Sequence, residues 1–212
     1  FFGFLVGGHN FHLHKEAVPR FGSAHSHDMI YRGRELQRLD GYSTDLFTDE
    51  ALGFMNRNKA KPWFLYLAYN AVHTPLEIAE KFRNRIPSNV TDANRRGYLS
   101  LLLGLDDAIG RIHAELKAKH PNTLVFFFSD NGGPGGAADN GTLRGTKWPL
   151  WEGGIHVPFI AQWKGRIPAG RTKPMGTADA LLQALYAMPA WSGSGFTVCN
   201  SDNLYSARAF AA

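Results

Sequence analysis

The chain has 212 residues, of which 44% are hydrophobic and 19% charged, the composition of an ordinary globular protein with one sizeable core. Its formal net charge is +5, but lysine and arginine are scattered along the chain, so nucleic-acid binding is not indicated. No run of residues is long and apolar enough to suggest a membrane span. The single cysteine, Cys199, excludes an internal disulfide.

The first forty residues are rich in glycine, histidine and arginine and show little periodicity, which predicts loop with a short strand at 29–32. The histidines of this stretch lack the spacing of converging metal ligands, and solvated loop side chains are the default expectation. They are His9, His12, His14, His25 and His27.

A helix is expected after this stretch, with Ser43 or Thr44 as its cap and Asp45 in its first turn. Its apolar face at helical spacing consists of Phe47, Ala51, Phe54 and Met55.

An unbroken apolar run at 63–69 predicts a strand buried on both faces, as in a parallel sheet. His73 lies just past the end of this strand, and Pro75 restricts the turn behind it. An isolated histidine in such a place is more often structural than catalytic, so position by itself leaves its role open.

A long amphipathic helix is predicted from a cap at Thr91 or Asp92 to the lysines before Pro121. It leads directly into a second apolar run at 123–130, so strand, helix and strand predict a βαβ unit with a right-handed crossover. The face of the helix is expected to comprise Tyr98, Leu102, Leu105, Ile109, Ile112 and Leu116.

The run at 123–130 ends in Asp130 and Asn131, followed by Gly132 and Gly133. A carboxylate beside an amide carbonyl offers two hard oxygen ligands of the kind that Ca²⁺ and Mg²⁺ prefer. The carboxyl ends of strands in open α/β sheets are also where ligands bind. The alternative from these residues is a simple turn.

A long, flexible, glycine-rich loop is predicted at 132–145, followed by Lys147 and a third apolar strand at 157–163. A lysine is a compact charge suited to a tetrahedral oxyanion, although spacing alone favours a solvated side chain. Beyond Pro174 the pattern fades: a helix is expected at 179–187, and 189–212 has no assignable role.

Taken together, several stretches resemble, in order, motifs of the sulfatase family of the alkaline-phosphatase superfamily. The resemblance covers most of residues 1–170 and implies an α/β fold with a mostly parallel sheet flanked by helices, here incomplete. A partial catalytic domain would occupy 1–188, with the tail at 189–212. The matching stretches are Phe1–Gly8, Pro62–Pro75 with its His-x-Pro, Leu105–Ile112, Phe128–Gly133 with its Ser-Asp-Asn-Gly, and Leu143–Lys147 with Glu152–Pro158.

The resemblance implies sulfate-ester hydrolysis of a sulfated small molecule or glycan. Asp130 and Asn131 would be ligands of Ca²⁺ rather than Mg²⁺, and Lys147 and His73 would bind the sulfate group, with His73 assisting the leaving oxygen. Family members commonly occur in the periplasm, in the lysosome or outside the cell, and the sequence does not choose among these compartments.

The chain departs from the family pattern at three points. No Cys/Ser-x-Pro-x-Arg motif for the family's formylglycine nucleophile occurs, so the chain is expected to be an internal fragment, inactive alone, with that motif upstream of Phe1. His156 stands where the family usually has arginine, without a fixed charge at neutral pH. Met175–Ala187 lacks the family's proline. Alternatives are a phosphodiesterase or phosphonate monoester hydrolase of the superfamily, and a non-catalytic binding protein that keeps the fold.

Overall fold

A computed structural model describes residues 1–5, 7–15, 29–168, 197–200 and 203–206. The chain divides into two compact units, Phe1–Pro121 and Asn122–Ala212, and each is described by itself. The helix predicted at 179–187 and the domain boundary predicted at 188 lie outside the described residues.

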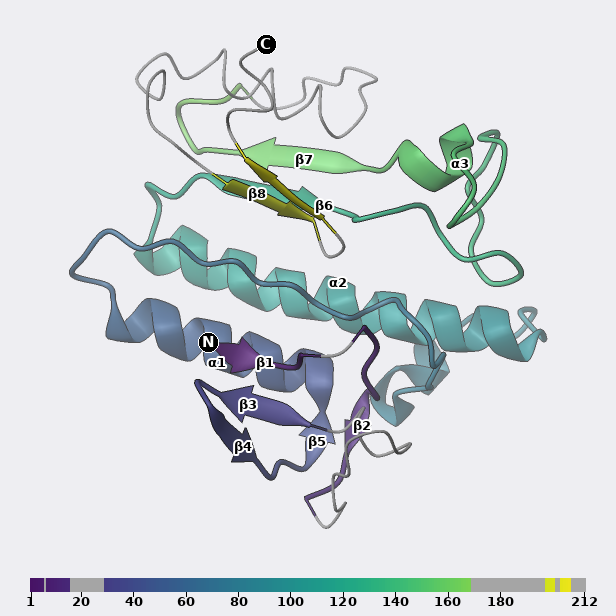
Figure 1. Cartoon of the computed structure of the whole chain (residues 1–212), viewed down its shortest axis with the longest axis horizontal. Coiled ribbons are helices and arrows are strands. Elements are labelled where there is room, and N and C mark those ends of the chain that lie inside the picture. The colour runs from purple at the N-terminus through teal and green to yellow at the C-terminus, as the bar shows by residue number, and fades with distance from the viewer. Residues whose placement is uncertain (6, 16–28, 169–196, 201–202, 207–212) are drawn as a thin grey trace. The chain divides into compact units, whose positions relative to one another are not determined.

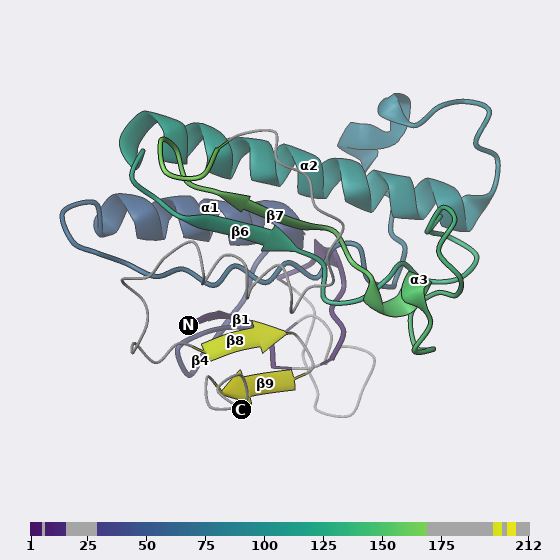
Figure 2. The same cartoon turned by 90° about the horizontal axis from the view of Figure 1, so that it is seen from above.

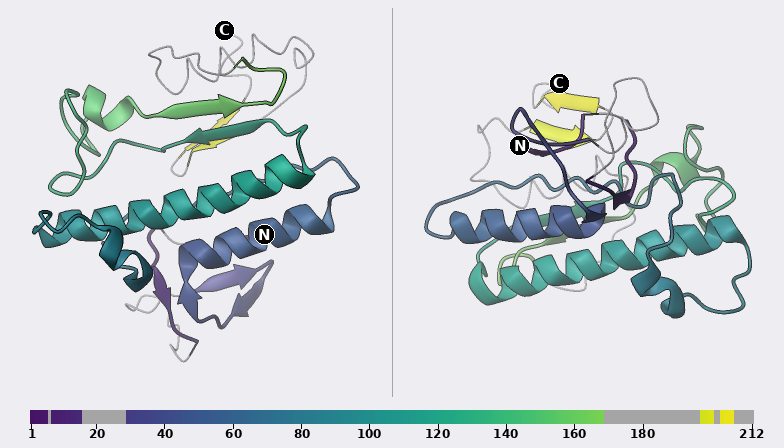
Figure 3. Two further views of the ribbon diagram at one scale, coloured as in Figure 1. Left: turned by 180° about the vertical axis from the view of Figure 1, so that it is seen from behind. Right: turned by 90° about the horizontal axis from the view of Figure 1, so that it is seen from below.

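Two long helices, α1 and α2, lie side by side in the first unit (Figures 1 and 3). A three-stranded antiparallel sheet has the order β1-β3-β4, and β2 pairs with β5. Strand β3 confirms the short strand predicted near 29–32, whereas the other short strands were not foreseen. The elements are β1 (Phe2–Gly3), β2 (His12–Leu13), β3 (Ile30–Arg32), β4 (Glu35–Gln37), β5 (Gly41–Tyr42), α1 (Ser43–Arg57), the 3₁₀ helix η2 (Glu80–Arg85) and α2 (Ala93–Lys119).

The core of this unit consists of two apolar clusters that join the helices to the short strands. One cluster unites Phe11, Tyr42, Ala79, Phe82 and Leu101. The other unites Leu13, Ile30 and Phe47, and partly buried side chains such as Leu67 and Tyr69 pack against it. Both clusters therefore connect segments that are far apart in the sequence.

The start of α1 differs from the prediction, because Tyr42 is its N-cap and no side chain caps it. Ser43 and Thr44 are instead the first helical residues, and both are fully buried. The backbone N–H of Ser43 donates to the carbonyl oxygen of Phe11 at 2.7 Å, so main chain from another segment replaces a side-chain cap. Asp45 lies in the first turn, as expected.

Helix α2 begins as predicted at Asp92, whose side chain accepts a hydrogen bond from the backbone N–H of Arg95 at 2.7 Å. Its fully buried face coincides with the predicted stripe only at Leu116. Leu102, a member of the predicted stripe, is 42% exposed. A Cβ on Gly97 would lie 2.2 Å from the carbonyl oxygen of Leu76, so small residues let neighbouring backbone approach the helix. The buried residues are Gly97, Ser100, Leu101, Gly104, Ala108 and Leu116.

The strand predicted at 63–69 is wrong in this structure, because no regular strand forms there. Burial alternates along the segment: Leu67 and Tyr69 pack against the core, whereas Phe64 is 81% exposed. An apolar run shows that a segment can be covered on both faces, but not that neighbours are present to cover both. The parallel pairing of this segment with 123–130 is therefore not seen.

In the second unit, β6 (Val125–Phe128) pairs antiparallel with β7 (Phe159–Gln162), and the short helix α3 (Glu152–Ile155) precedes β7 (Figure 2). These strands confirm the central parts of the strands predicted at 123–130 and 157–163. Ile160 is 57% exposed, so β7 is not buried on both faces. The strands β8 (Thr197–Asn200) and β9 (Asn203–Ser206) form a hairpin within the tail that the sequence left unassigned.

Every strand pair that the structure describes is antiparallel, and the mostly parallel sheet stays a prediction. Among the described residues, no helix has both the length and the apolarity needed to traverse a bilayer.

Candidate functional site

Asp130 and Asn131 follow the end of β6, as the sequence predicts, and the Asp130 side chain is exposed. The Nδ2 atom of Asn131 donates to the carbonyl oxygen of Gly132 at 3.1 Å, which leaves Oδ1 as the atom that can face a cation. The hydroxyl of Ser129 donates to the carbonyl oxygen of Asn131 at 2.8 Å and fixes the backbone between the strand and these two residues. The turn thus presents one carboxylate and one amide oxygen.

Glycine is required where this turn meets the start of α3. The N–H of Gly132 donates to the carbonyl oxygen of Gly154 at 2.9 Å. A Cβ on Gly132 would lie only 1.7 Å from the carbonyl oxygen of Gly153, which no side chain can tolerate. Gly153 in turn donates to the carbonyl oxygen of Arg144 at 2.7 Å. The backbone of Gly153 and Gly154 therefore packs directly against the backbone of Gly132 and of Arg144.

Main-chain bonds also bring Lys147 to the same turn. Its backbone N–H donates to the carbonyl oxygen of Gly133 at 3.0 Å, two residues after Asn131. Asn140 bridges the loop, because its Oδ1 accepts from the N–H of Gly133 at 3.2 Å and its Nδ2 donates to the carbonyl oxygen of Gly145 at 3.0 Å. The structure thus joins the backbone of three predicted site residues, Asp130, Asn131 and Lys147, through one glycine-rich loop.

The role of Asn140 was not predicted from the sequence. The signal available for it was an amide in a run of glycines, a residue type that commonly satisfies loop backbone through its side chain. Nothing local shows which backbone groups it reaches.

Cationic and aromatic side chains gather around Lys147. Its Nζ lies 5.1 Å from the ring centroid of Trp148, and the guanidinium carbon of Arg144 lies 3.4 Å from the ring centroid of Trp151. Each pair has cation–π geometry. Two positive charges within a few residues favour an anionic ligand at this edge of the second unit.

His73 lies in the first unit, in the loop after 63–69, with its side chain exposed. Its Nδ1 is 2.8 Å from the carbonyl oxygen of Thr74, an oxygen that can only accept. In this arrangement Nδ1 carries the proton, and Nε2 is the nitrogen that can exchange a proton with a ligand.

Hydrogen bonds anchor the His73 loop on both sides. The Nδ2 of Asn70 donates to the carbonyl oxygen of His9 at 3.3 Å. Oε2 of Glu77 accepts from the backbone N–H groups of Phe11 and His12 at 2.5 and 3.2 Å. His9 itself is buried and stacks on Phe4 with ring centroids 4.6 Å apart, so the expectation of a solvated histidine is wrong there. Packing of the first strands over the His73 loop explains the difference.

The four predicted site residues are thus divided between the two units. Asp130, Asn131 and Lys147 belong to one, and the placement of His73 next to them stays a prediction. Within the described residues, no cluster of three or more histidine, cysteine, aspartate or glutamate side chains is arranged to hold a metal ion.

His156 ends α3, and its Nδ1 lies 3.4 Å from Oε2 of Glu152, one helical turn earlier. It therefore has a local partner in α3.

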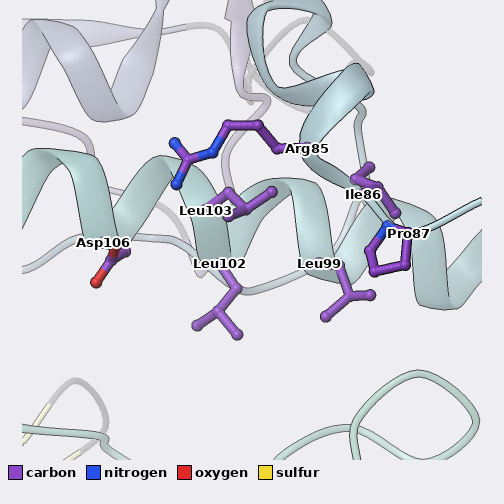
Figure 4. Close-up of a pocket in the computed structure, with 7 residues that line it drawn as sticks. All are labelled: Arg85, Ile86, Pro87, Leu99, Leu102, Leu103 and Asp106. Carbon is purple, nitrogen blue, oxygen red and sulfur yellow. The ribbon is translucent and has the colours of Figure 1, made fainter.

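A pocket of about 400 Å³ opens on the first unit between η2 and α2 (Figure 4). It contains none of the predicted site residues and was not foreseen from the sequence. Its lining is mostly apolar, with one charge of each sign, and comprises Arg85, Ile86, Pro87, Leu99, Leu102, Leu103 and Asp106.

Comparison with known proteins shows one consistent similarity. The family model described as Sulfatase matches residues 4–192. An arylsulfatase of Hemicentrotus pulcherrimus is 33% identical over 172 residues, which cover 78% of this chain and 29% of that protein. An N-acetylgalactosamine-6-sulfatase of Canis lupus familiaris is 36% identical over 137 residues, covering 60% of this chain and 25% of that protein.

Among solved structures, Ps i-CgsB in complex with k-i-k-neocarrahexaose aligns with a TM-score of 0.73 and 32% identity. The alignment covers 80% of this chain and 40% of that one. The chain therefore spans less than a third of the length of these two curated relatives.

Proposed function

The chain belongs to the sulfatase family, and from this premise we propose that it forms part of a catalytic domain that hydrolyses a sulfate ester. The solved relative was crystallised with a carrageenan-type oligosaccharide, and the curated relative from dog is named for a sulfated amino sugar. These names support a sulfated glycan as the substrate class.

In this proposal Lys147 binds the sulfate group through its ammonium, whose charge offsets the negative charge of the ester oxygens as the S–O bond breaks. His73 binds the same group and, in the form that carries a proton on both ring nitrogens, donates the Nε2 proton to the leaving oxygen, because Nδ1 already faces the carbonyl oxygen of Thr74. Both roles require that the two units bring His73 and Lys147 to one ester.

Asp130 and Asn131 fit a hard cation, because the turn presents a carboxylate oxygen and an amide oxygen whose amide nitrogen is already bonded. They would hold Ca²⁺ in preference to Mg²⁺, since Ca²⁺ accepts irregular sets of about six to eight oxygens, of which this pair supplies two. A bound cation there supplies charge neutralisation for the sulfate. No Cys/Ser-x-Pro-x-Arg motif occurs in this sequence, so the nucleophile is not among these residues.

One observation carries the proposal: the hydrogen bond from Lys147 N to Gly133 O ties the backbone of the anion-binding lysine to the turn that bears the two cation ligands. Residues 14 positions apart in sequence are thereby joined within one loop. A phosphodiesterase of the superfamily or a non-catalytic binding protein would remain as rivals, and the assay below separates them.

The test is Lys147→Ala in the full-length protein that contains this chain, assayed with a sulfated oligosaccharide. We expect kcat/KM to fall by about a hundredfold or more, since one charge-stabilising group is worth about this much. Lys164→Ala is the matched control, because Lys164 is an exposed lysine of the same unit just after β7.

Sulfate release that survives Lys147→Ala would contradict the assigned role. Faster cleavage of the matching phosphodiester would favour the first rival, and binding without turnover of either ester would favour the second.

A further inference from the structure

Trp148 combines two features that a structural tryptophan rarely shows. Its side chain is 86% exposed. Its backbone has φ of 90°, and among the described residues it is the one non-glycine with a positive φ. A bulky residue in the left-handed region is a strained conformation, and strain of this kind concentrates at ligand-binding sites.

The surrounding loop holds Trp148 in this conformation. A Cβ on Gly154 would lie 2.3 Å from the carbonyl oxygen of Pro149 and 2.7 Å from that of Thr146, so the backbone on both sides of Trp148 rests on Gly154. The N–H of Lys147 is bonded to Gly133. The indole is therefore presented outward by a backbone that is fixed on either side of it.

The neighbours of Trp148 favour one kind of occupant. The Lys147 ammonium is 5.1 Å from the indole centroid, and the exposed Arg144 lies in the same loop. A flat apolar face next to fixed positive charge matches a ligand with an apolar ring face and an anionic substituent. A sulfated sugar has both, because its ring carbons expose C–H groups and its sulfate is charged at all physiological pH values.

We propose that Trp148 and Lys147 form a ring-binding subsite for a sulfated sugar, in which the indole stacks on the sugar ring while the ammonium holds the sulfate. The inference rests on the proposed sulfatase function and makes Trp148 a specificity-determining residue for it. Leu150, two residues on, is 88% exposed but has no aromatic ring, so it provides a matched control of similar exposure.

The experiment measures two constants in the full-length protein: KM for a sulfated galactan hexasaccharide and the inhibition constant of inorganic sulfate. Trp148→Ala should raise KM about tenfold and leave the inhibition constant unchanged, because inorganic sulfate has no ring to stack. Trp148→Phe, which keeps a flat ring, should stay within about threefold of the original KM. Leu150→Ala should change neither constant.

Trp148→Gly separates binding from folding. Glycine adopts a positive φ without strain, so the glycine variant should unfold at a higher temperature than the alanine variant, while its KM rises as much. Equal or lower thermal stability of the glycine variant would remove the strain argument.

The outcomes distinguish the two proposals. Sulfate release that depends on Lys147, together with a KM unaffected by Trp148→Ala, overturns the subsite and leaves the sulfatase function intact. Absence of sulfate release from the unaltered protein overturns both. An equal rise in both constants would mean that Trp148 acts by placing Lys147, and would also overturn ring stacking.

Discussion

At the scale of single residues, the candidate site depends more on glycine than on the side chains that would do chemistry. Gly132, Gly153 and Gly154 allow three stretches of main chain to touch. The carbonyl and N–H groups of these stretches then bond to one another, which satisfies backbone that would otherwise be buried without partners.

Gly132→Ala should destabilise the second unit, since its Cβ would meet the carbonyl oxygen of Gly153. We expect a loss of about 2 kcal/mol or more in the free energy of unfolding, as for other insertions into packed backbone. Denaturant unfolding monitored by tryptophan fluorescence measures it. Gly135→Ala is the control, because its Cβ would have ordinary contacts at 3.5 Å or more, and equal losses in both variants would contradict the argument.

The sequence was sufficient to predict the strand that precedes Asp130 and Asn131, whereas the chemical roles of these residues and of Lys147 stay predictions. Asp130 and Asn131 follow β6, and Lys147 is tied to the same turn. It was not sufficient for Asn140 or for the contact of Gly132 with Gly153, because these depend on backbone atoms brought together from distant positions. Local patterns record turn propensity and not the partner that a turn will meet.

At the scale of elements, periodicity predicted that α1 and α2 are helices but not which face of α2 is most buried. The predicted stripe consists of large apolar side chains such as Leu102, whereas the closest contacts of the helix are made at Gly97 and Gly104. Small residues permit close approach but contribute little hydrophobicity. A pattern of apolar side chains at helical spacing therefore does not include them. Residues 63–69 also differ from their prediction, because this apolar run is covered on one face only.

The N-cap of α2 gives a prediction at this scale. Asp92→Ala removes the acceptor for the N–H of Arg95 and should cost about 1 kcal/mol. Thermal unfolding should shift down by about 2–4 °C if the whole chain unfolds as one. Thr91→Ala is the neighbouring control and should leave the midpoint almost unchanged; a matching shift in that variant would count against capping.

At the scale of the whole molecule, charged side chains tie elements together at the surface of the first unit. Glu50 of α1 accepts hydrogen bonds from Arg32 of β3 at 2.8 and 2.7 Å and from Arg57 at the end of α1 at 2.8 Å. Hydrogen bonding to Arg32 is the main cause that lowers the pKa of Glu50 to about 2.

This pKa sets a direction for stability against pH. A carboxyl whose pKa is depressed on folding stabilises the folded state above its unfolded pKa, near 4.3 in model peptides, and that contribution is lost as the pH falls toward about 2. Glu50→Gln should lower the free energy of unfolding at pH 7 by about 1 kcal/mol or less, because the arginines are largely exposed.

Urea unfolding at pH 7 and at pH 2.5 tests this expectation, with the difference between variant and original shrinking at the lower pH. Glu35→Gln, an exposed glutamate of β4, is the control. A difference that persists undiminished in acid would show that the effect is not one of charge.

The sulfatase family was likewise foreseen from the joint order of motifs, and the comparisons confirm it, whereas the mostly parallel sheet stays a prediction. A sheet depends on pairings between distant segments, and an apolar run specifies burial without specifying a partner or its direction.

The main-chain construction of the Lys147 loop has a consequence for how new specificities can arise. Since main-chain bonds and the side chain of Asn140 fix the path from 144 to 149, most outward-facing positions there can be exchanged without displacing Lys147. Variation of the outward-facing side chains is thereby uncoupled from preservation of the loop backbone. Relatives selected on different polysaccharides should accordingly vary at 148 and 150 while keeping the glycines beneath them.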